Sequence, residues 1–196
     1  MKKLALLFCA FVFAASAAHA NPWRVDYDKS HLTFTGEQAG KAFTGEFGAY
    51  LAKIDMDPVD PKNAKIDVTI QMKSAKTGDK QRDTALPGKD WFDVDISPEA
   101  VFTSSDVKKI DETHFEAKGT LTIKHITQDV TLPFVLSKEG DAVRAKGELV
   151  INRTAYNVGT GEWASEEWVA HKVTIGIDLL AVDATPPKTF KNLPKP

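Results

Sequence analysis

Arg82 and Asp83 are the residues best suited to polar chemistry in a sequence dominated by apolar alternation. They lie in an irregular segment that runs from Thr77 to Trp91. The planar guanidinium of Arg82 can bind a phosphate, a carboxylate or a carbonyl oxygen. Asp83 is near enough in sequence to hold or neutralise that charge, and the pair would then only fix the local structure. The sequence leaves a ligand contact and a structural ion pair open.

A second irregular segment, residues 159–168, carries two glycines and two tryptophans. Gly159 and Gly161 permit a tight turn. Trp163 can either fill the end of the apolar interior as a packed side chain or cover an apolar surface with its N–H toward solvent. Strand interiors use their backbone donors in the ladder, so contacts to a ligand headgroup must come from irregular segments. We therefore expect Arg82 and Trp163 at the mouth of a cavity.

The histidines outside the first twenty residues do not suggest a metal centre. His31, His114, His125 and His171 are far apart, and no pair has the spacing of metal ligands. A zinc or copper site assembled across strands stays open, although no metal or cofactor is expected. His171 falls on the apolar face predicted for the last strand, as a core histidine or a ligand contact. Sequence motifs of hydrolases, P-loop enzymes, zinc proteases and dinucleotide-binding folds are absent.

β-Strands must position these residues, because the dominant hydrophobic period is two. Ile66, Val68 and Ile70 alternate with polar residues in the first long example. Strands are expected at about residues 24–27, 32–38, 44–55, 65–73, 101–110, 114–123, 130–136, 143–151 and 169–179. Residues 79–91 break the alternation and predict one or two short helices with a turn at Pro87-Gly88.

About eight antiparallel strands, each with one apolar face, must bury that face. They can do so as two packed sheets or as one closed barrel, and the periodicity does not choose between them. A barrel of about eight strands is wide enough to hold a small ligand, which gives this version an evident function.

The first twenty residues have the features of an export signal. Lys2 and Lys3 precede an uncharged, mostly apolar run that ends in Ala18-His19-Ala20, an A-x-A cleavage site. The run is shorter than the roughly 20 residues of a membrane-spanning helix, although an uncleaved anchor stays as the alternative. We expect residues 1–20 to be a cleaved signal peptide, 21–182 to form the β-domain, and 183–196 to be a flexible tail rich in proline and lysine.

Composition limits the chemistry of the exported chain. Cleavage would remove Cys9, the single cysteine, so disulfide and thiolate chemistry are excluded. The loss of Lys2 and Lys3 would make the formal net charge, −2 over the whole chain, more negative. A mildly acidic chain has no electrostatic footprint for nucleic acid or an anionic membrane. The expected location is the periplasm.

The order of several short motifs resembles that of the YceI-like family. These motifs are Trp23-x-Val25-Asp26-x-x-x-Ser30-His31-Leu32-x-Phe34, Thr77-Gly78-x-x-x-Arg82-Asp83-x-x-Leu86, Trp91-Phe92-Asp93-Val94, Phe102-Thr103-Ser104 and Gly119-Thr120-Leu121-Thr122-Ile123. The resemblance covers almost the whole chain that would follow cleavage. It implies an all-β fold, an extended lipocalin-like antiparallel barrel of about eight strands with one or two short helices. Its interior would hold a polyisoprenoid or a similar long-chain amphiphile.

Gln38 departs from the family pattern, because many relatives carry a histidine there. Together with Gly159-x-Gly161-Glu162-Trp163, this departure is similar to a branch associated with membrane cytochrome b561 proteins. The resemblance implies a quinone-type tail as ligand or a redox protein of the membrane as partner. It leaves the oligomeric state undecided, with a homodimer as one alternative.

The expected function is that of a non-enzymatic carrier for a polyisoprenoid lipid, such as an isoprenoid quinone or a polyprenyl phosphate. The alternatives are an enzyme acting on such a lipid through Arg82, Asp83, His31 or His171, an accessory protein of a cytochrome b561, and a purely structural role. The cavity should reach several hundred Å³. The residues expected to contact the ligand are Phe34, Gln38, Phe47, Ile70, Arg82, Asp83, Trp91, Phe102, Leu121, Phe134, Trp163, His171 and Ile175.

Overall fold

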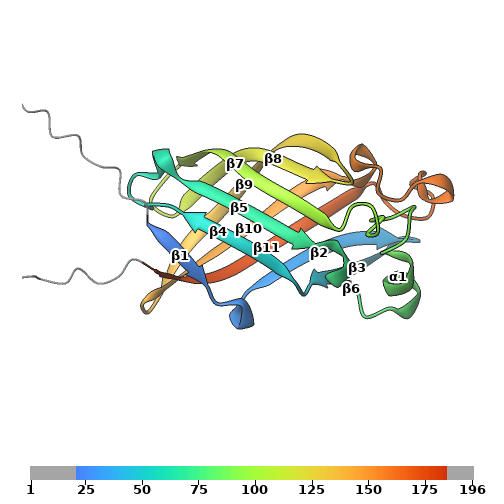
Figure 1. Ribbon diagram of the computed structural model, residues 1–196, viewed down its shortest axis with the longest axis horizontal. Helices are drawn as coiled ribbons and strands as arrows, with labels where there is room; N and C mark the ends of the chain where they lie inside the picture. The colour runs from blue at the N-terminus through green and yellow to red at the C-terminus, as the bar shows by residue number, and fades with distance from the viewer. Residues whose placement is uncertain (1–20, 185–196) are drawn as a thin grey trace, which may run out of the picture.

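Eight antiparallel strands close into a ring in the computed structural model, which describes residues 21–184 (Figure 1). In ring order they are β1 (Pro22–Val25), β4 (Tyr50–Asp55), β5 (Lys65–Gln71), β7 (Glu99–Lys109), β8 (His114–Ile123), β9 (Ile126–Glu139), β10 (Ala142–Asn152) and β11 (Lys172–Asp183). Pairing of β11 with β1 closes the ring. The predicted antiparallel barrel of about eight strands is confirmed. The proposed signal peptide and residues 185–196 of the proposed tail lie outside the described residues.

Three further strands branch from the ring. β2 (His31–Gln38) pairs with β11, β3 (Lys41–Phe47) pairs with β2, and the two-residue β6 (Ala75–Lys76) pairs with β3. The prediction of one strand over residues 44–55 was wrong, because the chain breaks there into β3 and β4. At the break the N–H of Gly48 donates to the carbonyl of Ser74 at 3.3 Å, outside any ladder.

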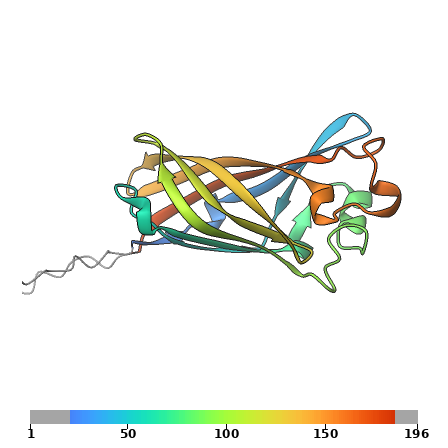
Figure 2. The ribbon, with the colours of Figure 1, turned by 90° about the horizontal axis from the view of Figure 1, so that it is seen from above.

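The irregular segments gather at one end of the barrel, opposite the end where β1 begins and β11 finishes (Figures 1 and 2). The predicted short helix is α1 (Lys80–Ala85), whose first turn is capped by Asp79 accepting from the N–H of Arg82 at 3.0 Å. The segment after β10 contains 3₁₀ turns at Arg153–Tyr156 and Gly161–Trp163. Within residues 21–184, no helix is long and apolar enough to cross a membrane.

The period of two places alternate residues inside the barrel, as predicted. Ile70, Phe102 and Leu121, on three successive strands of the ring, are all buried. On β9 and β10, Val135 and Val150 occupy the other face and are exposed. The apolar interior is therefore built from one side chain in two along most strands.

Candidate ligand-binding site

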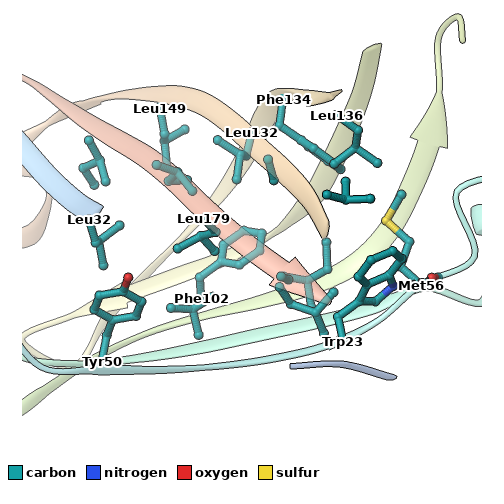
Figure 3. Close-up of a pocket in the computed structure, with 18 of the residues that line it drawn as sticks. Trp23, Leu32, Tyr50, Met56, Phe102, Leu132, Phe134, Leu136, Leu149 and Leu179 are labelled. Atoms are coloured by element: carbon teal, nitrogen blue, oxygen red, sulfur yellow. Dashed lines mark hydrogen bonds between the residues drawn. The ribbon is translucent and has the colours of Figure 1, made fainter. Parts of the chain in front are cut away.

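An apolar cavity of about 130 Å³ lies along the barrel interior (Figure 3). Its wall is almost entirely carbon, and the main contributors are Trp23, Leu32, Tyr50, Met56, Phe102, Leu132, Phe134, Leu136, Leu149 and Leu179. Five of the residues expected to contact a ligand line it: Ile70, Phe102, Leu121, Phe134 and Ile175. The volume is smaller than the several hundred Å³ expected, because large side chains from both sides of the barrel fill much of the interior.

A second cavity of about 320 Å³ lies among the irregular segments, and we call it the polar chamber. It is lined by Gln38, Phe43, Asp79, Gln81, Arg82, Ala85, Leu86, Trp91, Trp163 and Val169. Four residues expected from the sequence therefore meet at one place: Gln38, Arg82, Trp91 and Trp163. They come from the end of β2, from α1, from the loop after it and from the 159–168 insert.

Arg82 is held in place but keeps donor capacity. Its guanidinium lies 4.6 Å from the centre of the Phe43 ring. Nε donates to Thr77 Oγ1 at 3.3 Å, and Nη1 donates to Gln38 Oε1 at 3.2 Å. Among the described residues its one ion pair is with Asp79, at 3.9 Å, and its side chain is 28% exposed. A guanidinium with a distant counter-ion and unused N–H groups can bind an anionic or carbonyl headgroup.

Asp83 does not pair with Arg82, so the structure disfavours the alternative of an ion pair between them. Its carboxylate accepts from the backbone N–H and the hydroxyl of Thr77, at 2.7 and 2.8 Å. These hydrogen bonds lower the pKa of Asp83. Neighbouring helix positions point in different directions, so Asp83 turns back to the start of the segment while Arg82 faces the chamber. Asp83 is not among the residues that line either cavity.

Arg153 organises the 159–168 insert, although the sequence did not single it out. Its side chain is buried, at 2% exposure. It donates to the backbone carbonyls of Val158, Gly159, Trp163, Val169 and Ala170, at 2.6–3.0 Å. Burial lowers its pKa, an effect that the charge of Glu166 opposes. Carbonyl partners carry no sequence signal, so a lone arginine after a strand gave no indication of this role.

Trp91 and Trp163 form one wall of the polar chamber. Their ring centres are 5.8 Å apart, and the guanidinium of Arg153 lies 5.7 Å from the centre of the Trp91 ring. The indole Nε1 of Trp91 is buried and has no hydrogen-bond partner among the described residues. Trp91 lines the chamber, and its N–H is a donor without a partner beneath that wall.

His171 does not stand on the apolar face of the last strand, and that prediction was wrong. β11 begins at Lys172, so His171 lies in the short stretch between the 159–168 insert and that strand. Its Nε2 lies 2.7 Å from the carbonyl oxygen of Ala164, and its Nδ1 is 3.5 Å from Glu166. His31, the other histidine considered, is exposed and pairs with Glu46 at 2.8 Å. Neither histidine is among the lining residues of the cavities.

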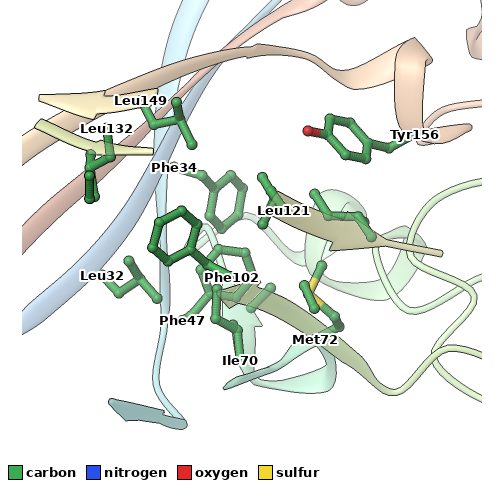
Figure 4. Close-up of a cluster of buried hydrophobic side chains, with 14 of the residues drawn as sticks. Leu32, Phe34, Phe47, Ile70, Met72, Phe102, Leu121, Leu132, Leu149 and Tyr156 are labelled. Carbon is green, nitrogen blue, oxygen red and sulfur yellow. The ribbon is translucent and has the colours of Figure 1, made fainter. Parts of the chain in front are cut away.

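Phe34, Phe47 and Phe92 are buried and are not among the residues that line either cavity, and we call them the aromatic partition. Figure 4 shows Phe34 and Phe47 within the buried cluster. The ring centres of Phe34 and Phe47 are 5.0 Å apart, and those of Phe47 and Phe92 are 6.2 Å apart. Along β2, Leu32 lines the apolar cavity, Phe34 follows, and Gln38 lines the polar chamber. Phe34 and Phe47 were expected to line a single cavity, and instead they line neither. Phe34 follows Leu32 of the apolar cavity and meets the Phe43 ring of the polar chamber at 6.5 Å, so we infer that the partition lies between the two.

The side chains that line the cavities set limits on their chemistry. Of the described residues that line them, the titratable ones are Tyr50 in the apolar cavity and Asp79 and Arg82 in the polar chamber. Within residues 21–184, no group of three or more His, Cys, Asp or Glu side chains is arranged to hold a metal ion. The geometry favours binding of a molecule with a hydrocarbon part and a polar end.

Two solved structures share this fold. The crystal structure of BcnA from Burkholderia cenocepacia is 34% identical, covers 81% of this chain and 100% of its own, and superposes with a TM-score of 0.78. A polyisoprenoid binding domain from Saccharophagus degradans is 13% identical, with a TM-score of 0.63 over 84% of this chain and 99% of its own. The second likeness concerns the fold alone.

Sequence comparison identifies the family. Protein YceI from Shigella flexneri is 32% identical over 146 residues, which are 72% of this chain and 76% of that protein. The family model for the YceI-like domain matches residues 23–181, nearly the whole of the described barrel. The chain therefore belongs to the YceI-like family.

Proposed function

We propose that this protein is a non-enzymatic carrier for a long-chain isoprenoid lipid, with the tail in the apolar cavity and the headgroup in the polar chamber. The observation that carries the proposal is the almost unbroken carbon wall of the apolar cavity. Each CH₂ group moved from water into such a cavity contributes about 0.8 kcal/mol, before the costs of ordering and desolvation. A long hydrocarbon tail is the ligand that gains most from this site.

The polar chamber supports a headgroup with acceptor oxygens. Arg82 and the N–H of Trp91 can donate, and the amide of Gln38 already contacts Arg82. A phosphate or a quinone carbonyl fits these donors. The Saccharophagus degradans domain, which has the same fold, is a polyisoprenoid binding domain, and this agrees with an isoprenoid tail.

The alternative of an enzyme acting on such a lipid has less support. Acid–base catalysis needs a proton donor or acceptor within hydrogen-bond reach of the reacting group. In the described chain, the ionised pair that lines the polar chamber is Arg82 with Asp79, 3.9 Å apart. This arrangement suits charge recognition better than proton transfer.

The proposal includes export to the periplasm, because residues 1–20 have the composition of a signal peptide. A carrier in that compartment would take its lipid from one membrane component and deliver it to another. A membrane cytochrome b561 is the partner suggested by the family resemblance for a quinone ligand.

Native mass spectrometry of the protein purified from the periplasmic fraction of its own cells tests the proposal. We expect a mature chain that begins at Asn21 and carries one isoprenoid lipid, identified by its fragments. Protein that emerges without lipid, and that binds none when offered an isoprenoid quinone or a polyprenyl phosphate in detergent, would overturn the proposal.

A further inference from the structure

Tyr50 supplies one polar group to a cavity that is otherwise carbon. Its ring stands on β4, and its hydroxyl points into the interior near Leu32 (Figure 3). No atom of the described residues meets hydrogen-bond geometry with this buried hydroxyl. A buried hydroxyl without a partner costs about 1–3 kcal/mol, whereas phenylalanine would fill the same space without that cost. The hydroxyl therefore needs a reason other than stability.

The neighbours of Tyr50 do not meet hydrogen-bond geometry with its hydroxyl. Ser30 lies near enough to lower the Tyr50 pKa, and its hydroxyl donates to the carbonyl of Asp26 at 2.7 Å and accepts from the N–H of Leu180 at 2.9 Å. One lone pair of the Ser30 oxygen is left, but the Tyr50 hydroxyl is not in hydrogen-bond geometry with it. The adjacent ring of Tyr27 meets Tyr50 edge-on, with the centres 5.3 Å apart. Burial raises the pKa of Tyr50 to about 12, so the hydroxyl stays protonated at neutral pH.

We propose that the Tyr50 hydroxyl is a second polar contact for a ligand, inside the apolar cavity. It would donate a hydrogen bond to the single acceptor oxygen of a neutral, mainly hydrocarbon ligand. A ketone, ester or ether oxygen fits this role. No charged side chain of the described residues lines the apolar cavity, so an anionic group would be desolvated there without compensation. Anionic headgroups are thereby confined to the polar chamber, beyond the aromatic partition. The inference rests on the proposed carrier function and adds neutral, singly oxygenated hydrocarbons to the ligands that it would carry.

Two isoprenoid probes of similar size separate the role of the oxygen from that of the hydrocarbon. Geranylacetone carries one ketone, and farnesene carries no oxygen. Removing the hydroxyl with Tyr50→Phe should weaken geranylacetone binding about five- to tenfold and leave farnesene binding unchanged. Tyr156→Phe is the matched control, because Tyr156 is buried but is not among the residues that line the cavities. We expect it to change neither affinity.

The infrared carbonyl band of ¹³C-labelled geranylacetone gives a readout that does not depend on affinity. We expect a lower stretching frequency on the wild type than on Tyr50→Phe, because the ketone accepts a hydrogen bond in the first case alone. Ala145→Leu narrows the apolar cavity without changing Tyr50, and it should weaken both probes. This second variant locates the binding even if Tyr50→Phe fails to fold.

The outcomes distinguish the inference from the carrier function. Equal binding of geranylacetone to wild type and Tyr50→Phe, with the same carbonyl frequency, would overturn the inference and leave the carrier function standing. Unchanged binding to Ala145→Leu would also overturn it, because the probe would then lie elsewhere. Failure of both probes to bind the wild type would count against the carrier function as well.

Discussion

At the scale of single residues, Arg82 carries the most specific prediction. Charge-assisted hydrogen bonds contribute about 1.5–3 kcal/mol, so Arg82→Ala should weaken binding of an isoprenoid phosphate roughly ten- to a hundredfold. The melting temperature should change little, because the side chain is partly exposed and its ion pair is long. Affinity can be measured by isothermal titration with farnesyl phosphate. Lys80→Ala on the same helix removes an exposed charge outside the chamber and should have no effect.

The opposite pattern for Arg82→Ala would assign the residue to structure. That pattern is unchanged lipid retention together with a melting temperature lowered by many degrees.

Arg153 is expected to behave in that opposite way, as a residue of structure. Arg153→Met leaves five backbone carbonyls without their donor and should lower the free energy of unfolding by about 3 kcal/mol. Urea denaturation followed by tryptophan fluorescence measures the loss. Arg24→Met is the control, because Arg24 is exposed on β1, and it should stay within about 0.5 kcal/mol of the wild type. A loss of less than about 1 kcal/mol for Arg153→Met would show that water replaces the guanidinium.

The site was predictable where it depended on residue type. It was not predictable where it depended on the direction in which a side chain points. Arg82 and Trp163 could be expected at one place, because irregular segments between strands are the part of a barrel with free polar groups. The separate orientations of Arg82 and Asp83 depend on one turn of helix, which spacing alone did not resolve. His171 fits the alternation of the last strand in the sequence, but it lies one residue before the strand begins. Arg153 binds backbone carbonyls, which every residue has, so its partners could not be read from residue types.

At the scale of elements, the 159–168 insert contributes to the wall of the polar chamber, and its two tryptophans have different surroundings. Trp163 lines the polar chamber, whereas Trp168 is 56% exposed and does not. Trp163→Ala should therefore speed the release of bound lipid, because the chamber loses part of its wall. Trp168→Ala is the matched control and should leave release unchanged. Transfer of a fluorescent isoprenoid to acceptor vesicles measures both rates of release. Equal rates for the two variants would contradict the prediction that Trp163 retains the ligand in the chamber.

Most strands were predictable because their side chains alternate between an apolar interior and water. The pairing partners of β3 and β4 were not predictable. β3 and β4 read as one alternating run in the sequence, yet they separate at Gly48 because β3 follows β2 while β4 belongs to the ring. The division of the interior into two cavities was also missed, since alternation assigns a side chain to the inside but gives no depth along the barrel axis.

At the scale of the whole molecule, the proposed carrier function makes the aromatic partition the boundary between recognition of the headgroup and burial of the tail. We infer that a lipid bound at Arg82 would have to displace one of these three rings, which pack 5.0 and 6.2 Å apart, before its tail reached the apolar cavity. Protein interiors are closely packed, so moving these rings aside costs free energy. Entry of the tail should therefore be slow compared with binding of the headgroup. Tail burial then holds the lipid in place.

A series of isoprenoid phosphates tests this order of events. Geranyl phosphate should bind fast and weakly in the polar chamber, whereas geranylgeranyl phosphate should bind more tightly and show a second, slower phase as its tail crosses the partition. Phe92→Ala should accelerate that slow phase and leave the fast phase unchanged, because Phe92 belongs to the partition and does not line either cavity. Stopped-flow fluorescence can follow both phases, since Trp91 and Trp163 line the chamber. Single-phase binding of both phosphates, at rates that Phe92→Ala does not change, would mean that the tail does not pass the partition.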